Sequence, residues 1–300
     1  MGIRLRRSLR RNAPGWGLMA PTVLVFAATG LYPLGYAAFL SLHRWRFLRT
    51  AEIERFVGLD NYLAILRDES YWWAMRQTVI FLAGTIPAEV VIGLALALAL
   101  NVIPRGANLF RTVLLTPMLI MPVVVSLIWR LTYDTQFGPL NHFLLQLGVL
   151  EKPVAWLSEP SLAMASIIVA TIWQWFPLSV LILSANLQVI PEEEYEVAEL
   201  DGANAVQGFR YITLPHLLPG LLVILLMRLM DGFRTFAIVY NLTHGGPGRA
   251  TNLISYYIYD VGFRGFDLGL GAAMALSLML VMVLLAVALT AFTNRFSAGS

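Results

Sequence analysis

Three ionisable residues occur at helical spacing inside one of the most apolar stretches of the chain. Arg228, Asp231 and Arg234 are each three positions apart, so a helix places them on neighbouring positions of one side. Ionisable side chains within a membrane helix are costly, and they pair with one another or mark the route of a polar solute. Two interpretations follow: Asp231 forms an ion pair with an arginine of its own helix, or these residues contact or gate a solute.

Glu89 is a further ionisable residue in an apolar stretch, and it follows Pro87 by two positions. Its carboxylate either caps the backbone that the proline frees or pairs with an arginine of a neighbouring span. We assign Glu89 and Arg228 to structural ion pairs within the membrane. Asp231 and Arg234 are assigned to a candidate solute path.

Aromatic and amide side chains are the other group suited to a polar solute. Trp173, Gln174 and Trp175 are consecutive, and such a cluster can stack on sugar rings. Tyr240 and Asn241 end the apolar stretch that holds Arg228, Asp231 and Arg234. Their polar ends meet a sugar or water there. For the tryptophans, the competing interpretation is packing in the membrane or an aromatic belt at its surface. The candidate substrate path thus comprises Asp231, Arg234, Tyr240, Asn241, Trp173 and Gln174.

The composition predicts that these side chains are held by membrane-spanning helices. Of the 300 residues, 58% are hydrophobic and 13% charged, and the mean hydropathy is +0.70. A soluble domain carries about twice that charged fraction. A spanning helix needs about 20 mostly apolar residues, and six segments qualify: about 17–42, 77–102, 110–131, 161–187, 217–241 and 267–293. We therefore expect an all-α polytopic membrane protein with one transmembrane domain over 17–293, between a basic tail, 1–16, and a short tail, 294–300.

Residues 188–216 separate the fourth and fifth predicted spans and differ from both. Six of the 18 acidic residues lie within this segment: Glu192, Glu193, Glu194, Glu196, Glu199 and Asp201. Pro191 suits the first turn of a helix, and acids in the turn that follows complement the helix dipole.

One face of this predicted helix is small and apolar. Tyr195, Ala198, Gly202 and Ala205 fall near one side, which permits another backbone to approach closely. Gly202 is a weak helix former, so the helix is expected to bend or end near it. Pro215 and Pro219 are expected to begin the fifth span. The alternative interpretation is an ordinary solvated surface helix.

The sequence lacks the motifs that are typical of several classes of protein function. The chain has no phosphate-binding G-x-x-x-x-G-K-[ST] loop, no H-E-x-x-H and no G-x-S-x-G, and its four histidines are scattered. Cysteine is absent, which excludes disulfides, thiol nucleophiles and cysteine-ligated zinc. The net charge of +3 is small for a nucleic-acid-binding protein. We predict no enzyme, no metal, no cofactor on this chain and no nucleic-acid partner.

The acidic segment resembles the EAA loop of ATP-binding-cassette importer permeases. Glu196, Ala198, Asp201-Gly202-Ala203 and Leu214-Pro215 match the family pattern, and nine residues separate Gly202 from Ile212, as that pattern requires. Val197 replaces the second alanine. Further matches, "LYPLGYAAFLSL", "FVGLDNY", "GLALALAL" and "LTHGGPGRATN", resemble the MalF-type sugar-permease branch. Phe236-Ala237 and His244 depart from the residues usual in that branch.

The resemblance implies a function for the chain and a role for the acidic segment. The chain is expected to be the membrane subunit of an ATP-driven, binding-protein-dependent importer of a sugar, oligosaccharide or polyol. The segment 188–216 would hold a cytoplasmic coupling helix, with Glu196, Ala198, Asp201, Gly202, Ala203, Leu214 and Pro215 serving the ATPase contact. The alternatives are an importer of glycerol-3-phosphate and a secondary transporter driven by an ion gradient.

The resemblance also implies partners and a location. We expect a second, homologous permease in a heterodimer, two ATP-binding-cassette ATPases that hold ATP and magnesium, and an extracytoplasmic solute-binding protein. The chain would lie in the lipid bilayer of the bacterial cytoplasmic (inner) membrane with both termini in the cytoplasm. The arginines alone do not decide this orientation, because they are frequent both before and after the first span.

Overall fold

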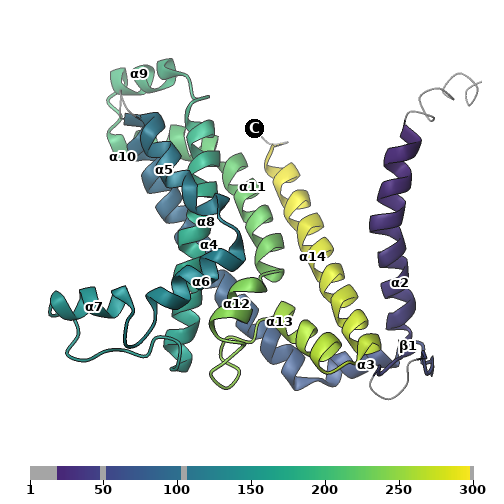
Figure 1. Cartoon of the computed structure of the whole chain (residues 1–300). Coiled ribbons are helices and arrows are strands. Elements are labelled where there is room, and N and C mark those ends of the chain that lie inside the picture. The colour runs from purple at the N-terminus through teal and green to yellow at the C-terminus, as the bar shows by residue number, and fades with distance from the viewer. Residues whose placement is uncertain (1–18, 48–51, 103–106, 298–300) are drawn as a thin grey trace, which may run out of the picture. The chain divides into compact units, whose positions relative to one another are not determined.

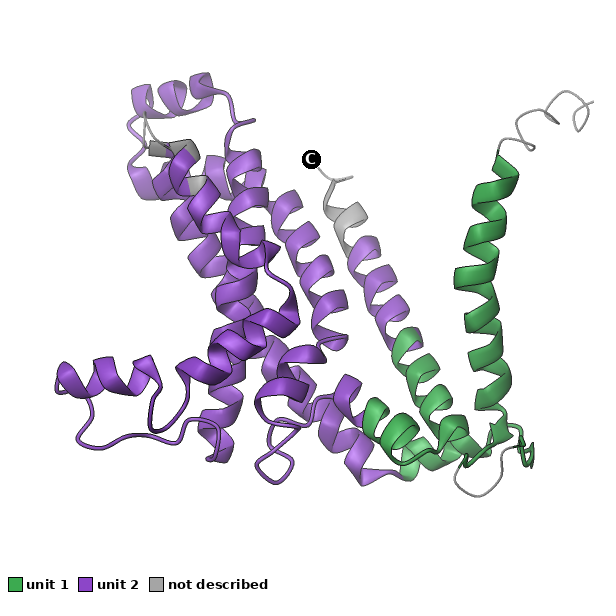
Figure 2. Ribbon diagram, viewed as in Figure 1, with its two compact units in different colours: residues 1–67, 258–279 green, residues 68–257, 280–300 purple. Residues whose placement is uncertain are grey.

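The computed structural model describes residues 19–47, 52–102 and 107–297, which form two compact units (Figure 2). The larger unit contains residues 68–257 and 280–300, and the smaller contains residues 1–67 and 258–279. The predicted tail 1–16 lies outside the described residues. The predicted tail 294–300 begins inside the last helix, α14 (Leu268–Ser297).

Three long helices form the centre of the larger unit: α4 (Glu69–Val102), α8 (Pro160–Leu187) and α11 (Leu214–Phe233) pack on one another (Figure 1). Two glycines allow this packing. A Cβ atom at Gly93 would lie 2.3 Å from Cβ of Ser179, and one at Gly232 would lie 2.1 Å from Cδ2 of Leu82. A larger side chain at Gly93 would push α4 and α8 apart, whereas one at Gly232 would displace the end of the Leu82 side chain.

The third predicted span, 110–131, is broken into two helices. α5 (Ala107–Leu119) and α6 (Pro122–Thr132) are bent by 100° relative to each other. Pro122 explains the break, because a proline restricts the preceding residue to extended backbone, and Met121 has ψ 137°. The amide Nε2 of Gln174 donates a hydrogen bond of 3.2 Å to the carbonyl of Ile120, which the break leaves without a helical partner.

The fifth predicted span, 217–241, differs at both ends. Helix begins earlier, with α10 (Ala205–Gly208) and the π-helical turn η2 (Phe209–Thr213), and runs into α11. The wider π turn shifts backbone pairing by one residue just before Pro215, so the proline stands inside a continuous rod. Helix stops at Phe233, and a short helix, α12 (Ala237–Leu242), follows.

An arm connects α6 to α8 and carries α7 (Pro139–Gln146). Its centre is the buried side chain of Asn141. This side chain donates to the carbonyl of Val154 at 2.9 Å and accepts from the backbone N–H of Val154 at 3.1 Å and from the indole of Trp156 at 3.0 Å. The amide of Asn141 therefore links the two ends of the arm.

The smaller unit contains a two-stranded antiparallel ribbon in which His43 pairs with Phe56 and Arg44 with Arg55. Asn61 of the predicted "FVGLDNY" match is buried there and donates to the carbonyls of Ser41 and His43. Further elements among the described residues are η1 (Ala27–Leu31), α2 (Tyr32–Ser41), β1 (His43–Arg44), β2 (Arg55–Phe56), α3 (Asp60–Arg67), α13 (Ile254–Tyr259) and η3 (Asp260–Arg264).

The described residues contain five helices that are long and apolar enough to cross a membrane, and six spans when the bent pair α5–α6 counts as one. The single helices are Met19–Ser41, Glu69–Asn101, Pro160–Leu187, Ala205–Phe233 and Leu268–Ala291. The predicted all-α polytopic fold is confirmed.

Candidate functional site

The acidic segment folds into a short helix, α9 (Glu192–Leu200), at one end of the central bundle (Figure 1). Its last turn closes with two hydrogen bonds, from Ala203 N–H to the carbonyl of Ala198 at 2.9 Å and from Gly202 N–H to that of Glu199 at 3.0 Å. This is the Schellman arrangement, which needs a left-handed residue. Gly202 provides it with φ +82°, so the helix ends where the sequence predicts.

A second capping device follows immediately. The side chain of Asn204 accepts from the backbone N–H of Gln207 at 3.0 Å, and the side chain of Gln207 accepts from that of Asn204 at 2.8 Å. This reciprocal box starts α10 and satisfies backbone donors that would otherwise lack partners. Only Ala203 separates Gly202 of the first cap from Asn204 of the second, so the chain turns within a few residues from α9 into α10.

Tyr195 attaches α9 to the bundle. Its hydroxyl lies 2.8 Å from the hydroxyl of Thr213, and its ring packs against the core cluster that contains Leu187 and Leu217. Between α9, α10 and the ends of α4 and α8 lies a hollow of about 600 Å³, which Ala198 and Ala205 help to line. Tyr195 therefore connects α9 directly to side chains of the spanning helices.

Half of the small apolar face predicted on this helix is turned towards the protein's own bundle, whereas Gly202 and Ala205 are exposed. Tyr195 and Ala198 are partly buried there, whereas the outward surface carries Glu196 and two large apolar side chains, Val197 and Leu200, which are 58% and 88% exposed. Spacing alone misses this, because it defines a face but not which neighbour covers it. Of the other predicted coupling residues, Asp201, Gly202 and Pro215 are exposed, and Ala203 and Leu214 are partly buried.

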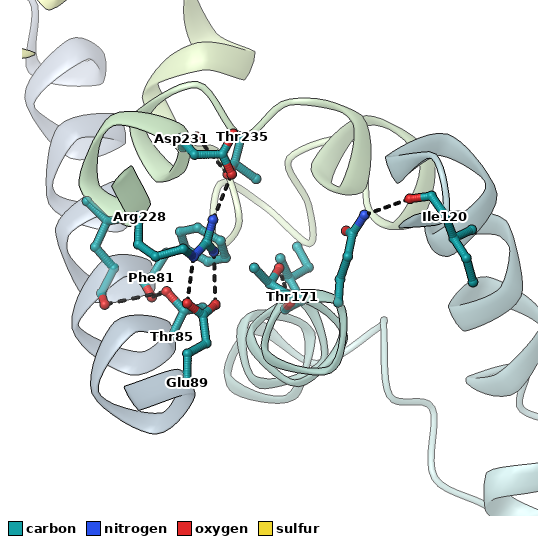
Figure 3. A network of polar contacts seen from close by, with 11 residues as sticks. Phe81, Thr85, Glu89, Ile120, Thr171, Arg228, Asp231 and Thr235 are labelled. Atoms are coloured by element: carbon teal, nitrogen blue, oxygen red, sulfur yellow. Dashed lines mark hydrogen bonds and ion pairs between the residues drawn. The ribbon is translucent and has the colours of Figure 1, made fainter. Parts of the chain in front are cut away.

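A cluster of charged side chains lies in the middle of the bundle (Figure 3). Arg228 on α11 binds Glu89 on α4 through two hydrogen bonds, with Nε–Oε2 at 2.6 Å and Nη2–Oε1 at 2.9 Å. Its third nitrogen donates to Oδ2 of Asp231 at 2.7 Å. The side chains of Glu89 and Arg228 are 0% and 1% exposed, so water does not screen their attraction.

Trp175 completes this cluster. The guanidinium carbon of Arg228 lies 4.8 Å from the centre of the Trp175 ring, which is close enough for a cation–π contact. The sequence places Trp175 beside Trp173 and Gln174 but gives no sign that it contacts an arginine of another helix. The cluster thus joins α4, α8 and α11 at one level.

Asp231 differs from its partners because its side chain is 47% exposed. Arg234, at the end of α11, is exposed as well. One oxygen of Asp231 is thus in an intrahelical ion pair, and the carboxylate also reaches the surface of the chain; its contact with a solute stays a prediction.

The other residues predicted for the substrate path each make a different contact and do not form one cluster with Asp231. Trp173 packs edge-to-face on Trp129 with ring centres 5.9 Å apart, and the amide of buried Gln174 supports the break in the third span. Tyr240 lies on α12, where its ring stacks on Phe236. The side chain of Asn241 donates to a carbonyl within its own helix.

No group of three or more potential metal ligands occurs among the described residues. α9 thus offers an exposed surface for contact with another molecule, and the buried cluster offers charged and hydrogen-bonding groups.

The fold is that of the membrane subunit of an ATP-binding-cassette transporter. The structure superposes with a TM-score of 0.82 on a chain of the bacterial alginate ABC transporter, crystallised in complex with an alginate pentasaccharide-bound periplasmic protein. The match covers 98% of each chain at 21% sequence identity.

The sequence comparisons define the family. Residues 89–298 match the model for the binding-protein-dependent transport system inner membrane component, and the chain belongs to this family. It is 37% identical to the probable ABC transporter permease protein y4oQ of Sinorhizobium fredii over 90% of this chain and 86% of that protein. It is 36% identical to the trehalose/maltose transport system permease protein MalF of Thermococcus litoralis over 86% of each.

Proposed function

We propose that this chain is one permease subunit of an ATP-driven importer of a neutral carbohydrate such as a disaccharide or polyol. The observation that carries the proposal is the similarity along nearly the whole chain to a permease named for trehalose and maltose transport. The half-exposed carboxylate of Asp231 at membrane depth supports a polar solute, because lipid does not solvate a charged group.

The proposed assembly contains a second, homologous permease, two ATPases and an extracytoplasmic solute-binding protein. ATP and magnesium would bind to the ATPases, since this chain has no phosphate-binding loop. α9 would be the coupling helix on the cytoplasmic side of the inner membrane. Its exposed Val197 and Leu200 would enter a groove of the ATPase, while Glu196 and Asp201 would face its polar rim.

Closure of the ATPases on ATP would then displace α9, and Tyr195 would transmit the displacement to the bundle. The energy comes from the difference in nucleotide affinity between the two conformations of the assembly. This chain performs no covalent chemistry in the proposal.

Transport in liposomes tests the function. The complete complex, with ATP inside and the solute-binding protein outside, should accumulate labelled trehalose or maltose, and omission of ATP should stop uptake. Uptake that an ion gradient sustains without nucleotide would replace the proposal with the secondary transporter. Uptake of glycerol-3-phosphate in preference to both sugars would favour the phosphate importer.

The cysteine-free sequence allows the position of α9 to be tested separately. Leu200→Cys should cross-link to the ATPase and should resist a membrane-impermeant maleimide in intact cells. Leu147→Cys, on the arm and 74% exposed, is the matched control and should behave in the opposite way. Labelling of Leu200→Cys from outside the cell would contradict the proposed orientation.

A further inference from the structure

The half-exposed carboxylate of Asp231 lies near the end of a candidate membrane span, where a water-filled space or another protein can receive it. α11 rises about 1.5 Å per residue, so Asp231 stands about 26 Å along the helix from Leu214, and it falls within the candidate span Ala205–Phe233. The hydrocarbon core of a membrane is about 30 Å thick. A side chain that is 47% exposed here cannot face lipid as a carboxylate.

The backbone next to Asp231 is irregular. Helix stops at Phe233 and restarts at Ala237, and the short α12 that follows packs on α6, the second half of the broken third span. Arg130 of α6 donates to the carbonyl of Asn241 at the end of α12. Irregular backbone at membrane depth is tolerated where protein buries it or where it lines an aqueous cavity.

Glu89, Arg228 and Asp231 together carry one net negative charge, while Arg234 at the end of α11 and Arg130, bonded to α12, are exposed cations. The single guanidinium of Arg228 is shared between two carboxylates, those of Glu89 and Asp231. Glu89 and Arg228 are fully buried and neutralise each other, so the excess charge is presented by Asp231. Its Oδ2 is occupied by Arg228, whereas Oδ1 receives no hydrogen bond from the described part of the chain.

We propose that Asp231 is a charge filter in the solute path: it accepts hydrogen bonds from the hydroxyl groups of neutral, polyhydroxylated solutes and disfavours anionic ones. Glu89 is a positioning residue in this proposal, because it never touches the solute and acts by fixing Arg228. The proposal rests on the proposed function, and it narrows the substrate to neutral carbohydrates or polyols at the expense of sugar phosphates and uronates.

A reactive thiol beside Asp231 measures this charge without any transported solute. Thr235 lies next to Asp231 (Figure 3), and its hydroxyl hydrogen-bonds the Asp231 carbonyl. Thr235→Cys would be the only cysteine of this chain. In the complete complex in nanodiscs, its reaction rates with a cationic and an anionic methanethiosulfonate are compared with those of a free thiol.

The cationic reagent should be favoured on the order of tenfold beyond its intrinsic ratio, which is the effect of one unit charge a few ångströms away in a partly aqueous site. Asp231→Asn keeps the shape and should abolish this preference. Glu89→Gln should reduce it too, because Arg228 then neutralises Asp231. Arg234→Gln is the matched control that removes a nearby cation, and it should preserve or increase the preference.

Three results would overturn the inference: a thiol that neither reagent reaches, equal corrected rates for both reagents, or a preference that survives Asp231→Asn. These outcomes are independent of the transport assay. Uptake without nucleotide, or uptake of glycerol-3-phosphate in preference to sugars, would reject the proposed function. A thiol without charge preference in a complex that does import a neutral sugar or polyol would reject the charge filter alone.

Discussion

Removal of the Glu89 carboxylate is the perturbation whose consequence the structure defines most closely. In Glu89→Gln, the side chain keeps its shape but places an amide N–H₂ against a guanidinium N–H, so one of the two short hydrogen bonds to Arg228 becomes a donor–donor contact. Breaking a buried ion pair from one side costs about 3–5 kcal/mol, because the remaining charge is left without solvation.

The remaining contacts of Arg228 set the value within that range. Asp231 still binds one nitrogen at 2.7 Å and Trp175 still covers the guanidinium, so part of the charge stays compensated. We therefore expect Glu89→Gln to lower the free energy of unfolding by about 3 kcal/mol. The assay is reversible unfolding of the purified chain in mixed micelles with a rising fraction of denaturing detergent.

A double variant separates the ion pair from general damage. Glu89→Met with Arg228→Met removes both charges and should cost less than the sum of the single changes by at least about 2 kcal/mol. Glu151→Gln changes an exposed glutamate of the arm and should leave stability within about 0.5 kcal/mol. A loss below about 1 kcal/mol for Glu89→Gln, or additive single changes, would refute the argument that these charges depend on each other.

Three further outcomes are expected. Gly202→Ala forces a Cβ onto a residue with φ +82° and should destabilise the end of α9 by about 1 kcal/mol. The complex should then transport less solute per ATP hydrolysed. Gly148→Ala, with φ +69° and equally open surroundings, is the control and should leave the amount of solute transported per ATP unchanged. Gly93→Ala places Cβ against Ser179 and should destabilise the α4–α8 contact by about 1–3 kcal/mol in micelle unfolding, with equal stability to the parent as the contrary result. Burial and the hydrogen bond to Asp68 raise the pKa of Tyr257 from 10.0 to about 12. Its contribution to stability is thus complete below pH 10 and is lost as the pH rises through about 12, so the tyrosinate absorbance missing in Tyr257→Phe should titrate near 12 and not near 10.

Local features of the site could be predicted because their causes are local. The end of α9 follows from Gly202, whose neighbours in sequence supply the hydrogen bonds that close the turn. The spans follow from apolar composition, since each must satisfy its own backbone in lipid. Arg228 and Asp231 were recognisable as partners because a helix brings residues three apart together.

The sequence assigned Glu89 and Arg228 to structural ion pairs, but the geometry that joins distant segments was beyond sequence patterns. Glu89 and Arg228 are separated by 139 positions, and only the packing of α4 against α11 makes them a bidentate pair. Which neighbour covers the small face of α9 was also left open by the sequence, because periodicity defines a stripe but not what packs against it. Prolines were equally ambiguous: Pro122 breaks a span, whereas Pro215 lies within one because a π turn precedes it.

The amino-acid sequence by itself determined that this protein is a bundle of membrane helices with an acidic, glycine-terminated helix outside it, since composition and nearest-neighbour geometry suffice for that. Tertiary structure alone decided that Arg228 is buried between Glu89 and Trp175 while Asp231 keeps an exposed carboxylate. The physical reason is that the energy of a charge depends on which side chains and how much water surround it, and helix packing sets both.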